Sequence, residues 1–309
     1  MIDAGYLCAA GCGVKVLSPL PRELCPRSSV GIVFPSPEAP MMLPQPITPT
    51  TEDPRALDSL DPEHTAVFLD FDGVLADIVD DPSDVTIRRD VIDNLAVIGE
   101  AAGGAIAVIS GRGIAQLTGF LSPLRMALSG AHGAECRSAD GRLWGEPQDP
   151  SLLDAIRSSL HDFARRHEGL MIETKPFSVA LHYRRNPDMG DTCLTLAEWI
   201  AETDERISLV CGKMVVELKT TVRTKADAID DFMGKMPFAG RMPVFFGDDV
   251  TDEDGFEAVN RRGGISVKIG EGETIASVRL RDTAAFRGWL NRTALSWQNS
   301  GARDRRQAR

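Results

Sequence analysis

From residue 65 onward, short apolar runs alternate with amphipathic stretches. Apolar runs of strand length occupy residues 66–72, 105–110, 125–130, 242–249 and 263–270. Runs of this kind are typical of the buried strands of a parallel sheet. Between the first two, residues 88–101 place Val91, Leu95 and Ile98 at helical spacing. This alternation predicts an α/β fold whose core is a doubly wound, Rossmann-like parallel sheet.

The middle of the chain has a different pattern. An amphipathic helix is predicted at 151–167 and a second helix at 189–202. Each is followed by two candidate strands, which lie at 170–174 and 178–184 and then at 206–211 and 213–219. The order αββαββ predicts an inserted α+β domain. We therefore expect a core made of residues 61–136 and 221–297, with a cap at 137–220 between its halves.

The two ends of the chain differ from this folded region. Nine of the nineteen prolines lie in the first fifty residues, and proline at this density blocks helices and removes sheet donors. Residues 1–60 are therefore predicted to form a disordered or loosely docked arm. Translation that begins at Met41 or Met42 is an alternative that the sequence leaves open. Residues 298–309 are expected to be a solvated basic tail.

Composition and charge exclude several classes of protein. The 309 residues carry a formal charge of −11, which argues against a nucleic-acid partner. No run approaches 18 uncharged apolar residues, so we expect no membrane-spanning helix. The six cysteines suggest no disulfide framework, and Cys8 and Cys12 lack the further ligands of a zinc site. With no charged start typical of a signal peptide, we expect a cytoplasmic protein.

Two aspartates directly follow the first predicted strand. Asp70 and Asp72 stand in the sequence DFDGVL, and Gly73 lets the chain turn away. Ligands of an open α/β sheet bind beyond the carboxyl ends of its strands, where both carboxylates are expected. Residues two apart on an extended chain share a face, so one carboxylate could attack a substrate while the other transfers protons. Taken alone, the pair could equally cap a helix or a turn.

Three further strand or helix ends carry polar groups. Asp248 and Asp249 offer carboxylate oxygens of the kind that Mg²⁺ prefers, and Asp252 suits both the site and a helix start. Ser110 follows the strand at 105–110, where a hydroxyl and free N–H groups could hold a phosphate oxygen. Lys225 opens an amphipathic helix, where a cation opposes the helix dipole and is better explained by anion binding.

In this order, the motifs DxDGxL, SGR, Lys225 and GDDxxD resemble those of the haloacid dehalogenase superfamily. The resemblance implies that Asp70 is a nucleophile that forms an aspartyl-phosphate, and that Asp72 is the general acid and base. It implies that Ser110 and Lys225 contact the transferring phosphoryl group. The implied cofactor is Mg²⁺, held by Asp70, the backbone carbonyl of Asp72, Asp248 and Asp249.

The predicted cap narrows the range of possible substrates. The segments SGAHGAE (129–135), ETKPFSVALHYR (173–184), GKMVVELK (212–219) and 245–270 resemble the trehalose-6-phosphate phosphatase family. The resemblance implies hydrolysis of trehalose 6-phosphate to trehalose and phosphate, the last step of trehalose biosynthesis. It also implies a set of substrate contacts in the cap or near the site entrance, which are Arg112, His132, Lys175, His182, Arg184, Lys213 and Glu217.

Simpler explanations stand beside this interpretation. The outward face of a half-buried strand carries polar side chains without any ligand; Tyr183, opposite His182, is expected in the core. A phosphatase for sucrose 6-phosphate or a glycosyl phosphoglycerate would show the same core motifs, and a non-catalytic regulatory module would be expected to have lost some of them. We expect a monomer, and the sequence leaves open whether a trehalose-6-phosphate synthase binds.

Overall fold

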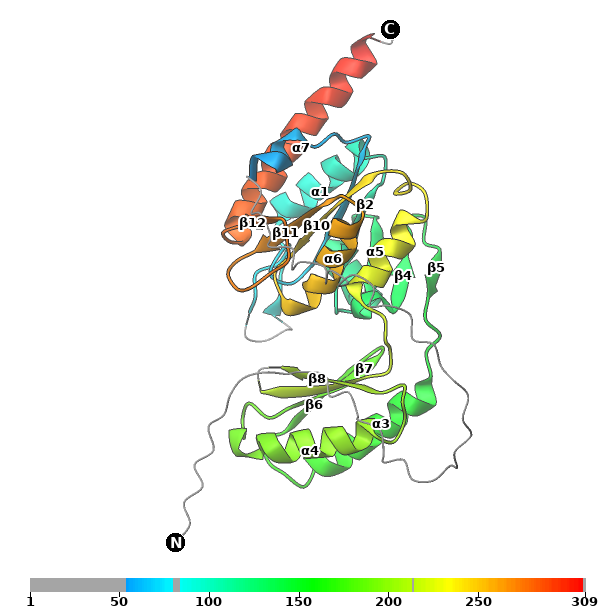
Figure 1. Cartoon of the computed structure of the whole chain (residues 1–309), viewed down its shortest axis with the longest axis vertical. Helices are drawn as coiled ribbons and strands as arrows, with labels where there is room; N and C mark the ends of the chain where they lie inside the picture. Colours follow the sequence, from blue (N-terminus) through cyan, green and yellow to red (C-terminus); the bar gives the residue numbers. More distant parts are fainter. Residues whose placement is uncertain (1–53, 80–83, 213, 308–309) are drawn as a thin grey trace, which may run out of the picture. The chain divides into compact units, whose positions relative to one another are not determined.

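The computed structural model describes residues 54–79, 84–212 and 214–307 (Figure 1). Residues 1–53, with Cys8, Cys12 and most of the predicted arm, lie outside the described residues. Lys213, one of the predicted substrate contacts, lies outside them as well. Among the helices of the described residues, none is long and apolar enough to cross a membrane.

The larger sheet has eight strands in the order β12–β11–β10–β1–β2–β3–β4–β5. Six of them run parallel: β1 (Thr65–Leu69), β2 (Ile106–Ile109), β3 (Ala127–Gly130), β10 (Met242–Gly247), β11 (Ile265–Ile269) and β12 (Val278–Leu280). Strands β4 (Glu135–Arg137) and β5 (Leu143–Gly145) extend it in antiparallel fashion. The predicted parallel sheet is confirmed, whereas β4, β5 and β12 were not predicted, because each has only three residues.

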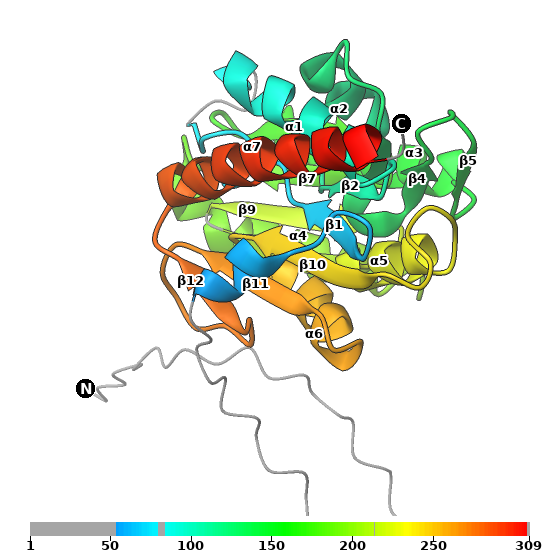
Figure 2. The ribbon, with the colours of Figure 1, turned by 90° about the horizontal axis from the view of Figure 1, so that it is seen from above.

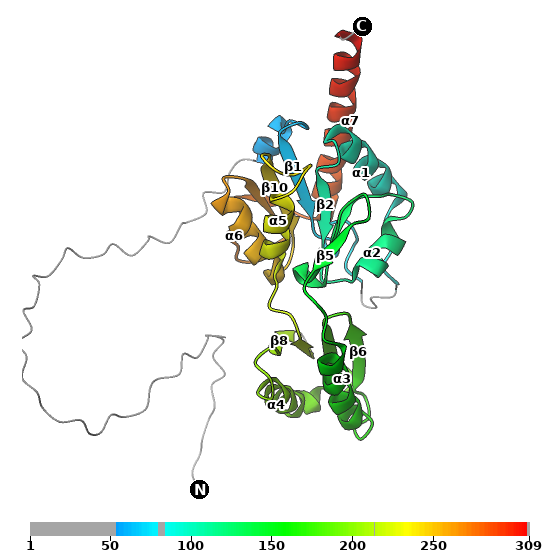
Figure 3. The same ribbon diagram turned by 90° about the vertical axis from the view of Figure 1, so that its right-hand side faces the viewer.

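Helices cover both faces of this sheet. They are α1 (Arg89–Ala101), α2 (Ile114–Leu121), α5 (Lys225–Met233), α6 (Glu253–Arg261) and α7 (Thr283–Gln307). Figure 3 shows α5 and α6 on one face and α1 and α7 on the other, and α1 and α7 pack against each other (Figure 2). The doubly wound arrangement therefore holds the strands between two helical layers.

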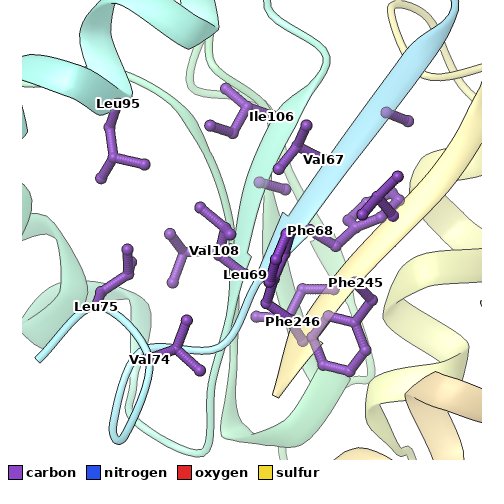
Figure 4. Close-up of a cluster of buried hydrophobic side chains, with 14 of the residues drawn as sticks. Val67, Phe68, Leu69, Val74, Leu75, Leu95, Ile106, Val108, Phe245 and Phe246 are labelled. Carbon is purple, nitrogen blue, oxygen red and sulfur yellow. The ribbon is translucent and has the colours of Figure 1, made fainter. Parts of the chain in front are cut away.

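The residues of the central strands explain why they are buried on both faces. On β1, the ring of Phe68 lies 6.2 Å from that of Phe232 of α5, while Val67 and Leu69 point the opposite way and are fully buried. On β10, Phe246 packs on Trp289 of α7 with ring centroids 4.3 Å apart. Figure 4 shows these strand side chains meeting in one apolar cluster. Continuous apolar strands of this kind need cover on both faces, and the helices supply it.

A smaller four-stranded sheet lies between β5 and α5 in the sequence. Its strands, in the order β6–β7–β9–β8, are β6 (Met171–Lys175), β7 (Ser178–His182), β9 (Val215–Lys219) and β8 (Ser208–Gly212), all antiparallel. Helices α3 (Pro150–Ala164) and α4 (Gly190–Ala201) pack on one face of it (Figure 1). We call residues 150–219 the inserted module; its αββαββ order is the one that the periodicity predicts.

The inserted module has a hydrophobic core of its own. Val179 and Leu181 of β7 and Val216 and Leu218 of β9 are buried against α3 and α4, and Tyr183 packs on the same cluster, as expected. Side chains alternate across a strand. The opposite face of the sheet is therefore left to Ser178, His182, Glu217 and the polar residues of β6.

The start of the folded region differs from the predicted boundary at residue 61. A 3-10 helix, η1 (Pro54–Ser59), packs against the core: Leu57 is buried, and its carbonyl accepts a hydrogen bond of 3.4 Å from the indole of Trp289. These residues therefore belong to the core and not to the arm. The sequence signal was weak because only Leu57 and Leu60 are buried among residues 55–60.

Two other boundaries differ as well. Strands β4 and β5 reach residue 145 within the larger sheet, so the core continues past the predicted cap boundary at 137. Helix α7 runs on to Gln307 through the predicted tail at 298–309. Trp297, just before that tail, is buried and its indole donates to the carbonyl of Leu60 at 3.1 Å, which anchors the helix.

Candidate active site

Asp70, Lys225 and Asp252 form a buried ion cluster beyond the carboxyl end of β1. Lys225 is the first residue of α5 and only 2% exposed. Its ammonium lies 3.0 Å from the carboxylate of Asp70 and donates to Asp252 at 2.6 Å. Asp70 also accepts a hydrogen bond of 2.7 Å from the N–H of Phe71. Strand β1 and helix α5 thus bring together two residues that are 155 positions apart in the sequence.

Asp252 fixes the loop that follows β10. One of its carboxylate oxygens accepts from Lys225, and the other accepts from the backbone N–H groups of Asp248 and Asp249, each at 2.9 Å. Both oxygens of this fully buried carboxylate are therefore occupied by donors. Asp252 orients Asp248 and Lys225, and this explains why an acid is needed at the end of η5 (Val250–Asp252).

The Asp248 carboxylate packs directly against Gly73. A Cβ atom at position 73 would lie 1.9 Å from an oxygen of Asp248, and Gly73 has a φ of +75°. Glycine is needed here both for the left-handed backbone and for the close approach. The turn after β1 is thereby shaped around the carboxylate that directly follows β10, the neighbour of β1 in the sheet.

The acidic edge fits a hard divalent cation. Carboxylate oxygens of Asp70, Asp248 and Asp252 all lie within 4.8 Å of one another. Burial raises the pKa of Asp70 well above its ordinary value, and it raises that of Asp248 to about 7; the other carboxylates add to both shifts. Burial by itself lowers the pKa of Lys225. The carboxylates of Asp70 and Asp252 outweigh burial and raise this pKa above its ordinary value, so Lys225 stays protonated. A site with this surplus of negative charge and oxygen donors suits Mg²⁺.

Asp72 is held by Arg112. The guanidinium forms two hydrogen bonds to its carboxylate, at 2.7 and 2.8 Å. Arg112 also lies over the rings of Phe71 and Phe120, 5.5 and 5.3 Å from their centroids. Arg112 is thus fixed by a bidentate ion pair and two aromatic contacts, and it holds the carboxylate of Asp72 at the mouth of the site.

Ser110 and His132 line another wall of the site. Ser110 is buried at the end of β2, where its hydroxyl accepts from the N–H of Arg112 at 3.1 Å. The ring of His132 lies over Gly111, so close that a Cβ there would be 2.5 Å from Nε2. Burial lowers the pKa of His132 to about 2, and the charge of Lys225 contributes. His132 is therefore neutral and can offer either a donor or an acceptor.

The open face of the inserted module carries a second polar cluster. Glu217 of β9 accepts from the ammonium of Lys175 at 3.2 Å and from the hydroxyl of Ser178. His182 of β7 lies 3.1 Å from Glu173 of β6, and this contact lowers the pKa of Glu173. Donors and acceptors in this density, on a face that no helix of the module covers, could bind the hydroxyl groups of a sugar.

Comparisons with known proteins place these features in one family. The sequence profile of the trehalose-phosphatase family matches residues 68–284. The chain belongs to this family. It is 39% identical over 240 residues to the trehalose-6-phosphate phosphatase of Escherichia coli, covering 78% of this chain and 90% of that protein. This trehalose-phosphatase family member is therefore a phosphoric monoester hydrolase.

Solved structures agree on the fold. The C-terminal domain of Candida albicans trehalose-6-phosphate phosphatase superposes with a TM-score of 0.66 at 21% identity, covering 79% of this chain and 98% of that chain. A haloacid dehalogenase-like hydrolase from Bacillus subtilis gives a TM-score of 0.54 at 14% identity, covering 73% of this chain and 99% of that chain. At these identities the likeness concerns the fold alone, which is the predicted α/β fold.

Most of the site residues predicted from the sequence lie at the acidic edge, around that edge or on the open face of the inserted module. Asp70, Lys225 and Asp248 lie together at the acidic edge, with Asp72, Arg112, Ser110 and His132 around them, and Lys175, His182 and Glu217 share the open face of the inserted module. Asp249 is exposed and caps η5 by accepting from the N–H of Val250 at 2.7 Å. Arg184 is exposed in the turn after β7.

The sequence pattern did not predict the contacts that three residues make near the site. Asp252 has a larger part in the cluster than the helix-start role suggested. Glu135 of β4 accepts from the N–H of Ile114 at 2.6 Å, and so caps α2 from another strand. Lys268 of β11 is buried and donates to the backbone carbonyl of Asp248. A single charge inside the apolar run ISVKI was the available signal for Lys268.

Proposed function

We propose that the chain hydrolyses trehalose 6-phosphate to trehalose and phosphate, through a phosphoryl group carried on Asp70. The observation that carries the proposal is the ion cluster: the ammonium of Lys225 lies between the carboxylates of Asp70 and Asp252, with Asp248 beside them. Family membership and the E. coli relative support the substrate.

In the first half of the proposed reaction, a carboxylate oxygen of Asp70 attacks phosphorus. The bond from phosphorus to the sugar oxygen breaks, and Asp72 gives that oxygen a proton. Asp70 is held in place by the N–H of Phe71 and by Lys225. Lys225 and Ser110 would then contact the phosphoryl oxygens and stabilise their developing charge. Asp72 can donate only after Arg112 releases one of its oxygens, so we assign Arg112 to the incoming substrate.

In the second half, Asp72 acts as a base. It takes a proton from a water molecule, whose oxygen attacks the phosphorus of the aspartyl-phosphate. The bond between phosphorus and Asp70 breaks, and the carboxylate is regenerated with release of phosphate. Because one residue serves both halves, Asp72 must lie at the edge of the site, where it can reach both the leaving group and water; its side chain is 40% exposed.

The proposed cofactor is Mg²⁺. Asp70, Asp248 and the backbone carbonyl of Asp72 would hold it. Asp252 would orient Asp248 and not bind directly, because it is fully buried and already accepts three hydrogen bonds, one more than the two donors that contact Asp70. When bound, the cation would neutralise the carboxylates and the phosphate so that two anions can meet. We do not include Asp249 among its ligands, because the side chain caps η5.

We propose that the inserted module is the substrate-specificity cap. A disaccharide has many hydroxyl groups, and Lys175, Glu217 and His182 on the open face are donors and acceptors of the required kind. Lys175 pairs with Glu217, and His182 pairs with Glu173. His132, neutral beside the phosphate contacts, is assigned to the sugar next to its 6-position.

A panel of phosphate esters tests the proposal. Phosphate release is measured from trehalose 6-phosphate, sucrose 6-phosphate and glucose 6-phosphate, with Mg²⁺ and with a chelator in excess. We expect strong preference for trehalose 6-phosphate and loss of release on chelation. Metal-dependent release from another ester alone would reject the substrate and the cap assignments. No release from any ester would reject a catalytic function and favour a regulatory one.

A further inference from the structure

Lys268 is a buried cation that the proposed mechanism does not use. It lies near the carboxyl end of β11 and is 4% exposed. In the sheet it pairs with Gly247, the residue just before Asp248. Its ammonium donates a hydrogen bond to the backbone carbonyl of Asp248. Lys268 therefore reaches the acidic edge from β11, the strand next to β10 in the sheet.

Packing and local pairing do not explain this residue. Among the residues that the structure describes, the backbone carbonyl of Asp248 is the acceptor assigned to its ammonium, and no carboxylate lies within 4.0 Å of it. Lys225, in contrast, contacts two carboxylates. A buried ammonium with one neutral acceptor is unfavourable unless a nearby field compensates it. A methionine would fill the same space without that penalty.

The compensating field comes from the carboxylate cluster. When all three are ionised, as cation binding requires, Asp70, Asp248 and Asp252 bring three negative charges, and Lys225 brings one positive charge. The charge of Lys268 acts on Asp248 and opposes the rise of its pKa that burial causes. With Lys268, the cluster keeps a surplus of one negative charge; without it, the surplus is two.

This difference in charge changes the affinities for two ligands in opposite directions. A divalent cation is held more tightly as the cluster becomes more negative, whereas a phosphate dianion is held less tightly. With both lysines present, the cation-loaded cluster carries one net positive charge. Without Lys268 it would be neutral and would attract phosphate less.

We propose that Lys268 is a positioning residue that acts through Asp248 and shifts the site toward phosphate binding at the expense of cation affinity. The inference rests on the proposed function, because it assumes that the acidic edge takes both Mg²⁺ and a phosphate group. It adds a role for a buried lysine on β11, outside the four motifs that indicate the reaction.

The test is calorimetry on the full chain with the Lys268→Met variant. Mg²⁺ is titrated into the substrate-free protein, and inorganic phosphate is titrated into the Mg²⁺-loaded protein. Removal of one charge near the cluster is expected to tighten Mg²⁺ binding and to weaken phosphate binding, each by at least tenfold, because two unit charges within about 12 Å of each other interact by about 1.4 kcal/mol or more at an effective dielectric of roughly 20. The KM for trehalose 6-phosphate should rise in parallel with the dissociation constant for phosphate, and kcat should change less.

Two further variants separate charge from structure. Lys235→Met removes an exposed lysine that donates to the carbonyl of Asp231 and lies over Trp144, and it should leave both affinities unchanged. Lys268→Arg keeps the charge and should keep the wild-type affinities for Mg²⁺ and for phosphate. It also serves if Lys268→Met does not fold.

The outcomes distinguish this inference from the proposed function. Opposite shifts of the two affinities support it. Weakening of both affinities would mean a merely structural role and would overturn it, as would no change in either. If the wild type binds Mg²⁺ and phosphate but does not hydrolyse trehalose 6-phosphate, the proposed substrate fails while the role of Lys268 is still decided by the two titrations.

Discussion

A single methyl group at Gly73 should inactivate the enzyme while leaving the fold intact. In Gly73→Ala, the new Cβ would lie 1.9, 2.1 and 2.6 Å from Oδ2, Cγ and Oδ1 of Asp248. All three distances are far shorter than a van der Waals contact, and the shortest would have to lengthen to about 3.4 Å. The Asp248 carboxylate must therefore leave its place at the acidic edge.

The magnitude has two separable parts. An alanine at a φ of +75° costs about 1–2 kcal/mol of stability, which corresponds to a fall in Tm of a few degrees for a domain of this size. The displaced carboxylate affects activity instead, since misplacement of a catalytic group by about 1 Å can lower the rate about a hundredfold. We expect at least that loss in kcat/KM for trehalose 6-phosphate.

Gly263→Ala is the matched control. Gly263 has a φ of +69°, and a Cβ there would meet no atom within 4 Å. Both variants should therefore lose similar stability by thermal unfolding, but only Gly73→Ala should lose phosphate release and Mg²⁺ binding. Activity of Gly73→Ala within about threefold of Gly263→Ala would refute the proposed role of the Asp248 carboxylate.

Three other variants test separate parts of the account. Lys225→Met leaves two buried carboxylates without a positive partner, so the free energy of unfolding, measured with denaturant, should fall by about 3–5 kcal/mol, and turnover should be lost. Lys235→Met, at an exposed lysine, should show neither effect. His182→Ala should raise KM for trehalose 6-phosphate more than it lowers kcat, and an unchanged KM would remove this residue from the sugar site. The pKa of Asp149 is lowered to about 2 by the hydroxyl of Ser151 and by backbone N–H groups of α3. This stabilises the fold above the ordinary aspartate pKa of 3.8 and is lost toward pH 2, so the Tm difference between wild type and Asp149→Ala should shrink below pH 3.8 and should not stay constant.

The pattern of apolar runs was sufficient for the architecture and for much of the acidic edge. Asp70, Ser110 and Asp248 each follow a buried strand, and parallel strands place their carboxyl ends at one edge of the sheet. Their place at one edge of the sheet could therefore be predicted without knowledge of the strand order. The alternation along β7 and β9 likewise indicated which residues face away from α3 and α4.

Other features depended on backbone geometry that a pattern does not contain. Asp249 and Asp252 are both acids after β10, and the turn of η5 decides that Asp252 enters the cluster while Asp249 caps the turn. The partner of Lys268 is a backbone carbonyl twenty residues away, which no side-chain motif records. Strands β4 and β5 are too short for alternation to be recognised.

The central claim is that Asp70 carries the phosphoryl group released from trehalose 6-phosphate. The most direct measurement is to quench the enzyme in acid during turnover, digest it and locate the phosphoryl group by mass spectrometry, with Asp70→Asn treated in parallel. The account predicts phosphate on the peptide that contains Asp70 in the wild type, and neither phosphopeptide nor turnover in the variant. Undiminished turnover of Asp70→Asn, or a phosphoryl group found on another residue, would contradict it.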